Sequence, residues 1–246
     1  MKLVVASLAG LALFLWPFAG LGLPPATPAI AVAVGTLLAL GLVEFGARGL
    51  DARLLALLAA LAAIDAALRS ALVSGIGGFS PIFFLVLCAG YVFGPSYGFL
   101  CGAAALLVSA VATGGLGSWI PYQMFATGWV GAGAGVAGRL GRGVWPLAVV
   151  GILAGFGFGA LLDIWDWTYF RGSPDLGWTP GLAAGETLLR FARFYLATSL
   201  AYDAFRAAGN AVLVLLVGTP VLAALERLHA RFTLEIVAQL QSHQAD

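Results

Sequence analysis

Long apolar segments separated by short polar or glycine-rich stretches make up almost the whole chain. One apolar run follows Lys2 and continues to Gly22, and a second covers residues 27–43. A stretch of about 20 apolar residues forms a helix long enough to cross about 30 Å of hydrocarbon. The pattern therefore predicts an all-α integral membrane protein. We expect about eight transmembrane segments, the other six being residues 52–73, 81–93, 96–112, 121–138, 144–165 and, as one kinked or two-part crossing, 187–225.

Composition supports lipid as the solvent of these segments. Of the 246 residues, 61% are hydrophobic and 9% are charged, whereas a soluble domain carries roughly 25% charged residues. Lys2 is the only lysine, so the chain lacks the Gly-Lys-Ser/Thr needed for a phosphate-binding loop. Any ATP that drives this protein must therefore bind to another subunit. The formal net charge of +1 points to no particular partner, and we expect no nucleic acid.

Histidine and cysteine are scarce, and their positions exclude several kinds of site. His229 and His243 both lie in the expected C-terminal tail, residues 229–246, which excludes a zinc-protease motif and a Ser-His site within the membrane. Cys88 and Cys101 stand singly on expected helices without metal-ligand spacing. We interpret both cysteines as packing residues. We predict no catalytic residue, no metal site and no cofactor in this chain.

Arginine and lysine positions predict the orientation of the chain. Alternating the expected segments across the membrane places most basic residues on one side, which the positive-inside rule makes cytoplasmic together with both termini. The outer side has only Arg171, with Arg190 and Arg193 near it. The residues on the cytoplasmic side are Lys2, Arg48, Arg53, Arg139, Arg142, Arg227 and Arg231.

Two glycine-rich stretches, residues 75–81 and 113–121, frame an expected helical hairpin. Because one hairpin separates them, both must emerge on the same face of the membrane. The charge count adds the tryptophan-rich segment 163–186 to that outer face. Irregular backbone at membrane depth is tolerated where protein buries it or where it lines a watered cavity. We therefore interpret the two glycine-rich stretches as two walls of one binding pocket.

Small residues recur at four-residue spacing on several expected helices. On helix 52–73 this spacing lets another helix approach closely, either from the same chain or from another membrane subunit. The same helix carries Asp65 and Arg69, which form either an ion pair at i, i+4 or a functional group at membrane depth. Glycines on helices 121–138 and 144–165 predict that these two pack closely, and Gly218 and Pro220 should kink the last span. The alanines of helix 52–73 form two lines, Ala52–Ala56–Ala60 and Ala59–Ala63–Ala67–Ala71.

A longer run of sequence resembles a known family. The run FSPIFFLVLCAGYVFGPSYGFLCGAAALLVSAVATGGLGSWIPYQMFATGWVGAGAG resembles the substrate-binding membrane subunit (S component) of energy-coupling factor (ECF) vitamin transporters. The ending AAGNAVLVLLVGTPVLAALERL is similar to the last helix of the same proteins. The resemblance covers roughly residues 52–228 and is strongest over residues 91–98 and 117–131.

The resemblance implies a six-helix domain, residues 51–228, that captures a vitamin or vitamin precursor from outside. The ligand would lie beneath the loops at residues 75–80, 113–120 and 163–186. Alanines of the first helix would dock on a transmembrane coupling (T) subunit, and two ATPase subunits would complete an ABC-type importer in a bacterial or archaeal plasma membrane. The chain departs from the family in its N-terminal hairpin, residues 1–50, and in a more polar segment at 187–202. The docking candidates are Ala56, Ala59, Ala60 and Ala63.

A vitamin pocket needs aromatic walls and a few fixed polar groups. We predict nine substrate-binding residues from the start of helix 121–138, the end of helix 144–165 and the last span. Asn210 suits an amide or a heterocycle because its side chain both donates and accepts. For each residue the alternative is an interfacial aromatic or a satisfied polar group between helices. The nine are Trp119, Tyr122, Gln123, Trp129, Trp165, Asp166, Trp167, Arg206 and Asn210.

Two other classes of function are compatible with the sequence. An ion-coupled secondary transporter would use Asp65, Asp203 and Arg206 as coupling residues, although no inverted repeat is visible. A membrane enzyme would use Asp163 and Asp166 as part of a metal–diphosphate site, although no second acidic motif accompanies them. Cobalamin, riboflavin, thiamine and a pyrimidine precursor all remain candidate substrates, and the resemblance leans slightly to a cobalamin-type ligand.

Overall fold

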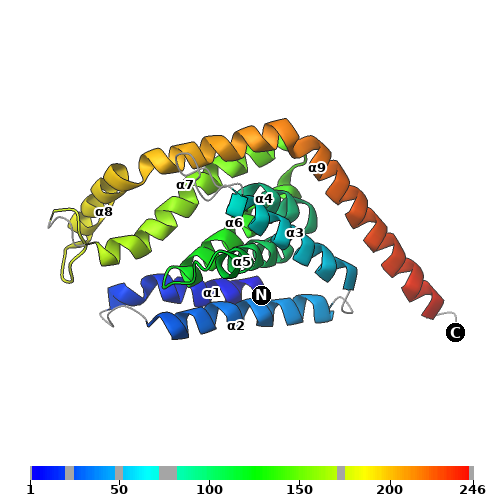
Figure 1. The fold of residues 1–246 in the computed structure, drawn as a ribbon, viewed down its shortest axis with the longest axis horizontal. Coiled ribbons are helices and arrows are strands. Elements are labelled where there is room, and N and C mark those ends of the chain that lie inside the picture. Colours follow the sequence, from blue (N-terminus) through cyan, green and yellow to red (C-terminus); the bar gives the residue numbers. More distant parts are fainter. Residues whose placement is uncertain (1, 20–24, 48–51, 72–81, 171–174, 244–246) are drawn as a thin grey trace.

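The structure is a computed structural model that describes residues 2–19, 25–47, 52–71, 82–170 and 175–243, with side chains described as far as residue 232. All of its regular elements over these ranges are helices (Figure 1). The elements are α1 (Lys2–Leu15), η1 (Trp16–Ala19), α2 (Ala26–Ala47), α3 (Ala52–Ala71), α4 (Ile82–Phe93), α5 (Pro95–Ala112), α6 (Ile120–Leu140), α7 (Val144–Tyr169), α8 (Ala184–Thr198) and α9 (Leu200–His243).

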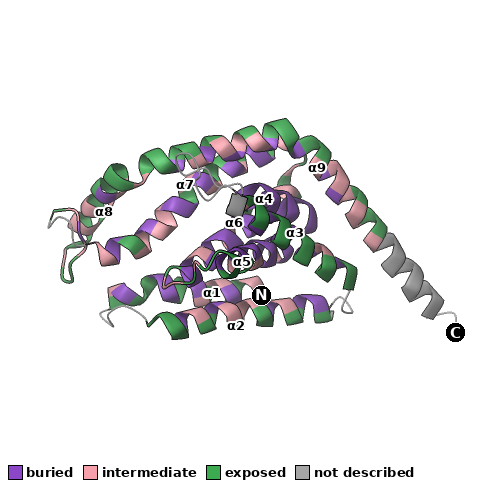
Figure 2. Cartoon of the chain, in the orientation of Figure 1, coloured by how far each residue is buried: buried purple, intermediate pink, exposed green. Residues whose placement is uncertain are grey.

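Three helices, α4, α5 and α6, form the centre of the molecule and meet at glycines. A Cβ atom added at Gly98 of α5 would lie 2.3 Å from the carbonyl oxygen of Gly131 on α6. One added at Gly90 of α4 would lie 2.0 Å from the same oxygen. Only glycine permits such an approach, because any side chain would overlap the facing backbone. The three helices form the mostly buried centre of Figure 2.

The N-terminal hairpin lies along one side of this centre. Helices α1 and α2 run side by side beneath α5 and α6 (Figure 1). Gly10 of α1 faces the rings of Phe125 and Trp129 on α6, and a Cβ atom there would lie 2.5 Å from Phe125. The hairpin that a six-helix subunit does not need is therefore packed directly on the central helices.

The glycine repeat of α7 faces α9 and not α6. A Cβ atom at Gly155 would lie 2.5 Å from the Cα atom of Ala207, and one at Gly159 would overlap the Asp203 carboxylate. The glycines of α6 pack instead on α4 and α5. The prediction that α6 and α7 pack closely through their glycine repeats was therefore wrong, although the two helices do touch. Spacing marks a helix face that another backbone can approach, but it does not identify the partner.

The polar segment after the tryptophan-rich loop is split at Ser199. Helix α8 ends at Thr198 and α9 begins at Leu200. Helix α9 continues through Pro220 and changes direction in its orange part, as Figure 1 shows. The bend follows from the missing N–H of proline. The segment is thus a two-part element with a bend further along, as the sequence predicted in outline.

Several contacts hold the ends of α4 and α6 together with α7 and α9. The Tyr91 hydroxyl donates to the carbonyl oxygen of Gly141 at 2.6 Å, and Arg142 pairs with Glu226 at 2.9 Å. The His229 ring stacks on Phe93 with centroids 5.1 Å apart. These contacts join the last turns of α4 and α6 to the start of α7 and the middle of α9. Arg142 and Arg227, assigned to one side by the charge count, therefore lie near the same end.

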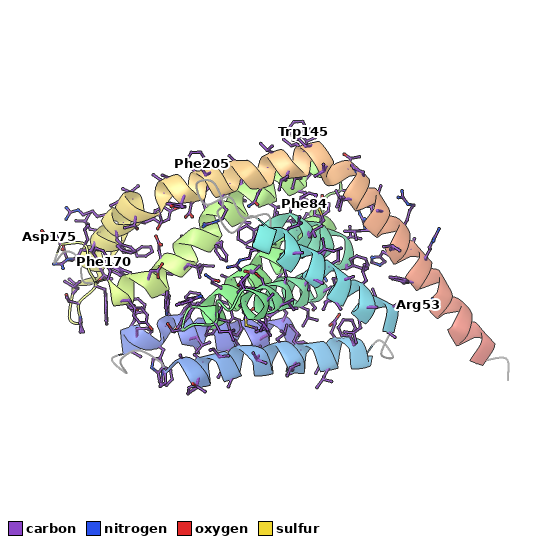
Figure 3. The ribbon with its side chains drawn as sticks, viewed as in Figure 1. Arg53, Phe84, Trp145, Phe170, Asp175 and Phe205 are labelled. Carbon is purple, nitrogen blue, oxygen red and sulfur yellow. The ribbon has the colours of Figure 1, made fainter. Side chains whose placement is uncertain are left out.

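The described helices fit a multi-pass membrane protein. Five are long and apolar enough to cross a bilayer, and α4, with 12 residues, extends only about 18 Å. Helix α3 carries three charged side chains, and α6 is rich in glycine and alanine, so neither is among the five; the count of eight segments stays a prediction. Trp145 and Phe205 are 72% and 60% exposed and point away from the bundle, as lipid-facing side chains do (Figure 3). The five are Lys2–Ala19, Ala26–Gly46, Pro95–Ala112, Val144–Tyr169 and Leu200–Phe232.

Candidate substrate-binding site

A cavity of about 370 Å³ lies between the start of α6 and the end of α7. The chain turns back between these two helices, so the first turn of α6 and the last turns of α7 lie at the same end of the bundle. Four of the nine predicted substrate-binding residues line this cavity, and Leu162 is the fifth lining residue, which the sequence interpretation missed. The four are Trp119, Gln123, Trp165 and Asp166.

Two buried polar atoms of the lining residues have no hydrogen-bond partner among the described residues. They are the side-chain oxygen Oε1 of Gln123 and the indole nitrogen Nε1 of Trp165. A buried polar group without a partner costs free energy, so native structures usually satisfy such groups with protein, water or a ligand. Asp166 adds an exposed carboxylate to the same cavity. The cavity thus offers one donor and several acceptors beside apolar walls.

The indole of Trp119 stands at the entrance and is 42% exposed. Gly117 packs beneath it, because a Cβ atom there would lie 2.4 Å from the Trp119 ring. This explains one glycine of the predicted pocket wall 113–121: it makes room for an aromatic ring. The other predicted wall, residues 75–81, lies outside the described residues.

Tyr122 and Trp129 lie behind the cavity and not on its lining. The Tyr122 ring packs on Trp165 with centroids 5.5 Å apart and on Phe14 of α1 at 5.0 Å. Trp129 lies on the same face of α6, where it also packs on Phe14 and donates its indole N–H to the Ser7 hydroxyl at 3.0 Å. The face that the sequence identified as ligand-facing is therefore covered by the hairpin, with Tyr122 supporting the cavity from behind.

Trp167 fixes the loop that follows α7. Its indole N–H donates to the carbonyl oxygen of Leu176 at 2.6 Å, and its ring is buried against Phe191 of α8 and Phe18 of the hairpin. Trp178 also packs on Phe18, with centroids 5.1 Å apart. Of the three tryptophans in segment 163–186, Trp165 therefore lines the cavity, and Trp167 and Trp178 pack against the hairpin.

Arg206 and Asn210 lie in the interface between α7 and α9. Asn210 is fully buried and donates from Nδ2 to the carbonyl oxygen of Gly151 at 3.0 Å. Arg206 pairs with Asp203 and stacks over the Phe158 ring at 5.2 Å. Neither residue lines the cavity. Both residues are polar groups between helices, as the alternative from the sequence stated, but Oδ1 of Asn210 and Nε of Arg206 have no hydrogen-bond partner among the described residues. A role in substrate binding stays a prediction.

A buried polar cluster surrounds the break between α8 and α9. Ser199 donates to Asp163 at 2.7 Å, and the Tyr195 hydroxyl donates to Asp203 at 2.9 Å. Asp163 and Asp166 have different surroundings, the first in this cluster and the second at the cavity. Among the described residues, no three His, Cys, Asp or Glu side chains form a group that could hold a metal ion.

Helix α3 turns its predicted docking alanines outward. Ala56, Ala59, Ala60 and Ala63 are exposed, while leucines on the opposite face are buried against the bundle. Asp65 points inward and is fully buried. Neither of its carboxylate oxygens has a hydrogen-bond partner among the described residues. The ion pair with Arg69 that the sequence allowed is therefore not hydrogen-bonded, and the four alanines lie on the exposed face of α3.

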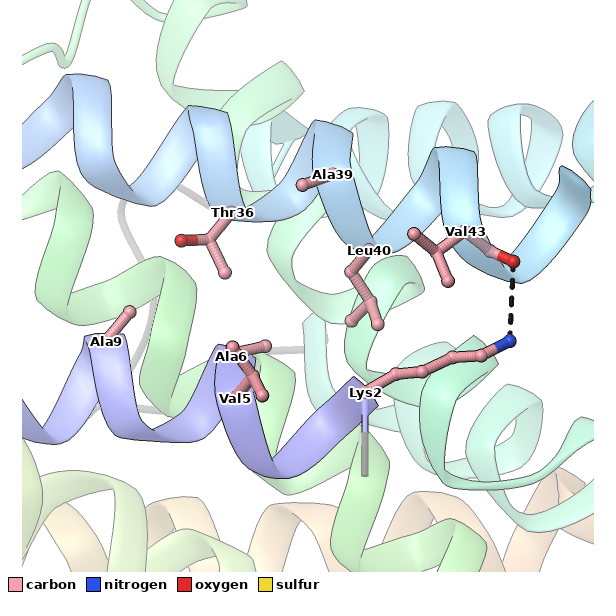
Figure 4. Close-up of a pocket in the computed structure, with 8 residues that line it drawn as sticks. All are labelled: Lys2, Val5, Ala6, Ala9, Thr36, Ala39, Leu40 and Val43. Carbon is pink, nitrogen blue, oxygen red and sulfur yellow. Dashed lines mark hydrogen bonds between the residues drawn. The ribbon is translucent and has the colours of Figure 1, made fainter.

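A second cavity, of about 310 Å³, lies between α1 and α2 (Figure 4). Its lining is apolar apart from Thr36 and Lys2. The Lys2 ammonium closes one end, donating to the carbonyl oxygen of Val43 at 3.3 Å and lying 3.8 Å from a Glu44 carboxylate oxygen. With its one cation already held, this groove offers little to a polar ligand.

The α6–α7 cavity therefore has the features of a small-molecule site. Its walls are aromatic, its polar groups are few, and its volume falls within the usual range of ligand pockets. Comparison of the chain with protein-family models, curated proteins and solved structures found no match.

Proposed function

We propose that this chain is the membrane-embedded substrate-binding subunit of an ECF-type importer and that it captures a vitamin or vitamin precursor. The observation that carries the proposal is the convergence of four predicted ligand residues on one cavity. They come from two helices that are separated by more than a whole membrane crossing in the sequence. Residues chosen for their chemistry and depth would not line a common cavity unless the segments share one end of the bundle.

The outward alanines of α3 support a partner subunit. Contact with lipid alone does not require alanine, because larger apolar side chains pack against lipid equally well. Small residues instead allow the close approach of another helix. In the proposed complex this helix belongs to the transmembrane coupling subunit, and ATP is bound by two further subunits, since this chain has no phosphate-binding loop.

The size of the cavity bears on the substrate. A volume of about 370 Å³ accommodates a compound of one or two rings with its substituents. It is small for a corrin with its nucleotide arm, so the cavity favours a thiamine-, riboflavin- or pyrimidine-sized ligand over the cobalamin type. We therefore propose a small-ring vitamin or precursor as the substrate.

The test is uptake with and without the partner subunits. Cells that lack vitamin import would express this chain alone, the coupling and ATPase subunits alone, or all together, and the accumulation of radiolabelled vitamins would be measured. We expect substrate binding by this chain alone and ATP-dependent uptake only with the partners. Uptake by this chain alone, abolished by an ionophore, would overturn the proposal.

One observation favours a second candidate, an ion-coupled secondary transporter. Asp65 is a fully buried carboxyl without a hydrogen-bond partner among the described residues, and such a group at membrane depth is a common coupling site. In that case Asp65→Asn would abolish ion-dependent transport by the chain alone in vesicles. Under the ECF proposal the same substitution leaves ATP-driven uptake by the full complex independent of the ion gradient.

A further inference from the structure

The described lining of the α6–α7 cavity carries one negative group and no positive one. The negative group is the Asp166 carboxylate. Two arginines on neighbouring elements are already held, since Arg206 pairs with Asp203 and Arg190 pairs with Glu186. Arg193 of α8 is exposed and does not line the cavity. An anionic ligand would therefore meet an unopposed carboxylate, whereas a cationic or neutral ligand would not. Charge in the lining thus discriminates between substrates by repulsion as well as attraction.

The unsatisfied atoms define the hydrogen bonds that a ligand must make. Oε1 of Gln123 needs a donor, and Nε1 of Trp165 needs an acceptor. Both atoms belong to residues that line the same cavity. A ligand edge that carries a donor beside an acceptor, such as a carboxamide, a lactam or an aminopyrimidine, has a partner for each of these atoms once it enters between the two side chains. A purely apolar ring would leave both unpaired and bind poorly.

The apolar part of the lining sets the shape. Trp119 and Trp165 contribute indole rings, and Leu162 contributes an aliphatic contact. Aromatic rings pack best on planar groups, and a cation gains further from the face of an indole. The aromatic lining and the carboxylate therefore favour the same class of ligand.

We propose that the cavity selects a flat heteroaromatic ring that bears an adjacent hydrogen-bond donor and acceptor and is cationic or neutral, not anionic. This inference rests on the proposed function only for the assignment of the cavity as the substrate site. It assigns the cation preference to Asp166 and the recognition of the donor–acceptor edge to Gln123 and Trp165.

Three pyridines of one size test the selectivity directly. Nicotinamide is neutral and has a donor–acceptor edge, 1-methylnicotinamide adds a positive charge, and nicotinate replaces the amide with a carboxylate. Binding to the full chain in lipid nanodiscs would be measured by calorimetry and by quenching of tryptophan fluorescence, up to millimolar concentration. We expect 1-methylnicotinamide to bind up to about fivefold more tightly than nicotinamide, because one partly exposed ion pair is gained. Nicotinate should bind most weakly.

Two substitutions assign the preference to its residues. Asp166→Asn should bring the affinity ratio of 1-methylnicotinamide to nicotinamide close to one. Asp175→Asn removes an exposed acid that does not line the cavity, so it should leave the ratio at its wild-type value of up to about five. Gln123→Met keeps the length of the side chain but removes the acceptor, and it should weaken both amides about tenfold.

Three results would overturn the inference: nicotinate binding as tightly as the amides, a cation preference that persists in Asp166→Asn, or no binding of any of the three compounds. These failures differ from failure of the proposed function. ATP-dependent, partner-dependent uptake of an anionic vitamin would keep the ECF assignment and refute the selectivity. Selective binding of the cation without any partner-dependent uptake would keep the selectivity and refute the ECF assignment.

Discussion

The rings of Tyr122 and Trp165 lie with their centroids 5.5 Å apart, and this contact joins the start of α6 to the end of α7. On its other side Tyr122 meets Phe14 of α1 edge to face at 5.0 Å. Tyr122 is almost fully buried, and its hydroxyl has no partner among the described residues. The Tyr122 ring thus connects the N-terminal hairpin to the wall of the cavity, because it packs on a residue of each.

Replacing this ring should damage the cavity and the fold together. We expect Tyr122→Leu to reduce the free energy of unfolding by about 2 kcal/mol, through lost aromatic contacts and a packing defect. Ligand affinity should fall at least about tenfold, since the Trp165 ring loses its support. Thermal unfolding in detergent and calorimetric titration of the ligand measure the two effects. Tyr202→Leu, at an exposed position on α9, is the matched control and should change neither. Unchanged affinity in a folded Tyr122→Leu variant would show that the hairpin contact does not reach the site.

The glycine beneath Trp119 offers a gentler perturbation of the site. Gly117→Ala places a methyl group where the indole now lies, so the ring must move out of the cavity entrance. We expect weaker ligand binding with little change in the unfolding temperature, because the loop is at the surface. Gly133→Ala is the control, since a Cβ atom there meets nothing within 4 Å. Equal ligand affinity in the two variants would remove Trp119 from the binding site.

The bounds of the central helices could be predicted because their ends carry strong local signals. Gly94-Pro95 ends α4 and starts α5, and Gly94 has a φ of 96° that favours glycine. The shared end of α6 and α7 followed from counting crossings and basic residues. For this reason four of the residues that line the cavity could be predicted from residue type and from the expected position of each segment end in the membrane. No glycine or proline marks the break at Ser199, and leucine and alanine lie on both sides of it.

The direction of individual side chains could not be predicted. Trp129 and Tyr122 are seven residues apart and share a helix face, but nothing in their spacing indicates that α1 covers that face. Asn210 has the chemistry of a ligand contact, yet Gly151 leaves a backbone carbonyl accessible on α7 and the amide donates there. These outcomes depend on which helices become neighbours, a property of the tertiary packing that a single helical pattern does not contain.

The α7–α9 interface makes a stability prediction with an internal control. Gly159→Ala would drive a methyl group into the Asp203 carboxylate, which is held by Tyr195 and Arg206. We expect a loss of about 3 kcal/mol or more in unfolding free energy, through overpacking and disruption of a buried ion pair. Gly157→Ala lies on the same helix with no atom within 4 Å of its Cβ position. It should be neutral or stabilising by up to about 1 kcal/mol, since alanine favours a helix. Thermal unfolding of both variants measures the difference, and equal stability would contradict the close packing.

The outward alanines of α3 separate binding from transport. A bulky side chain at Ala60 or Ala63 would hold a partner helix away, while the bundle itself would be unaffected because both positions are exposed. We expect Ala60→Trp and Ala63→Trp to lower ATP-driven uptake by the assembled importer at least about tenfold and to retain ligand binding by the isolated chain. Leu68→Trp, at an exposed α3 position that already carries a large side chain, should retain uptake. Co-purification with the coupling subunit gives an independent measure, because a docking face predicts that the complex dissociates in the alanine variants alone. Full uptake and an intact complex in both variants would mean that α3 faces lipid and that the partner, if one exists, docks elsewhere.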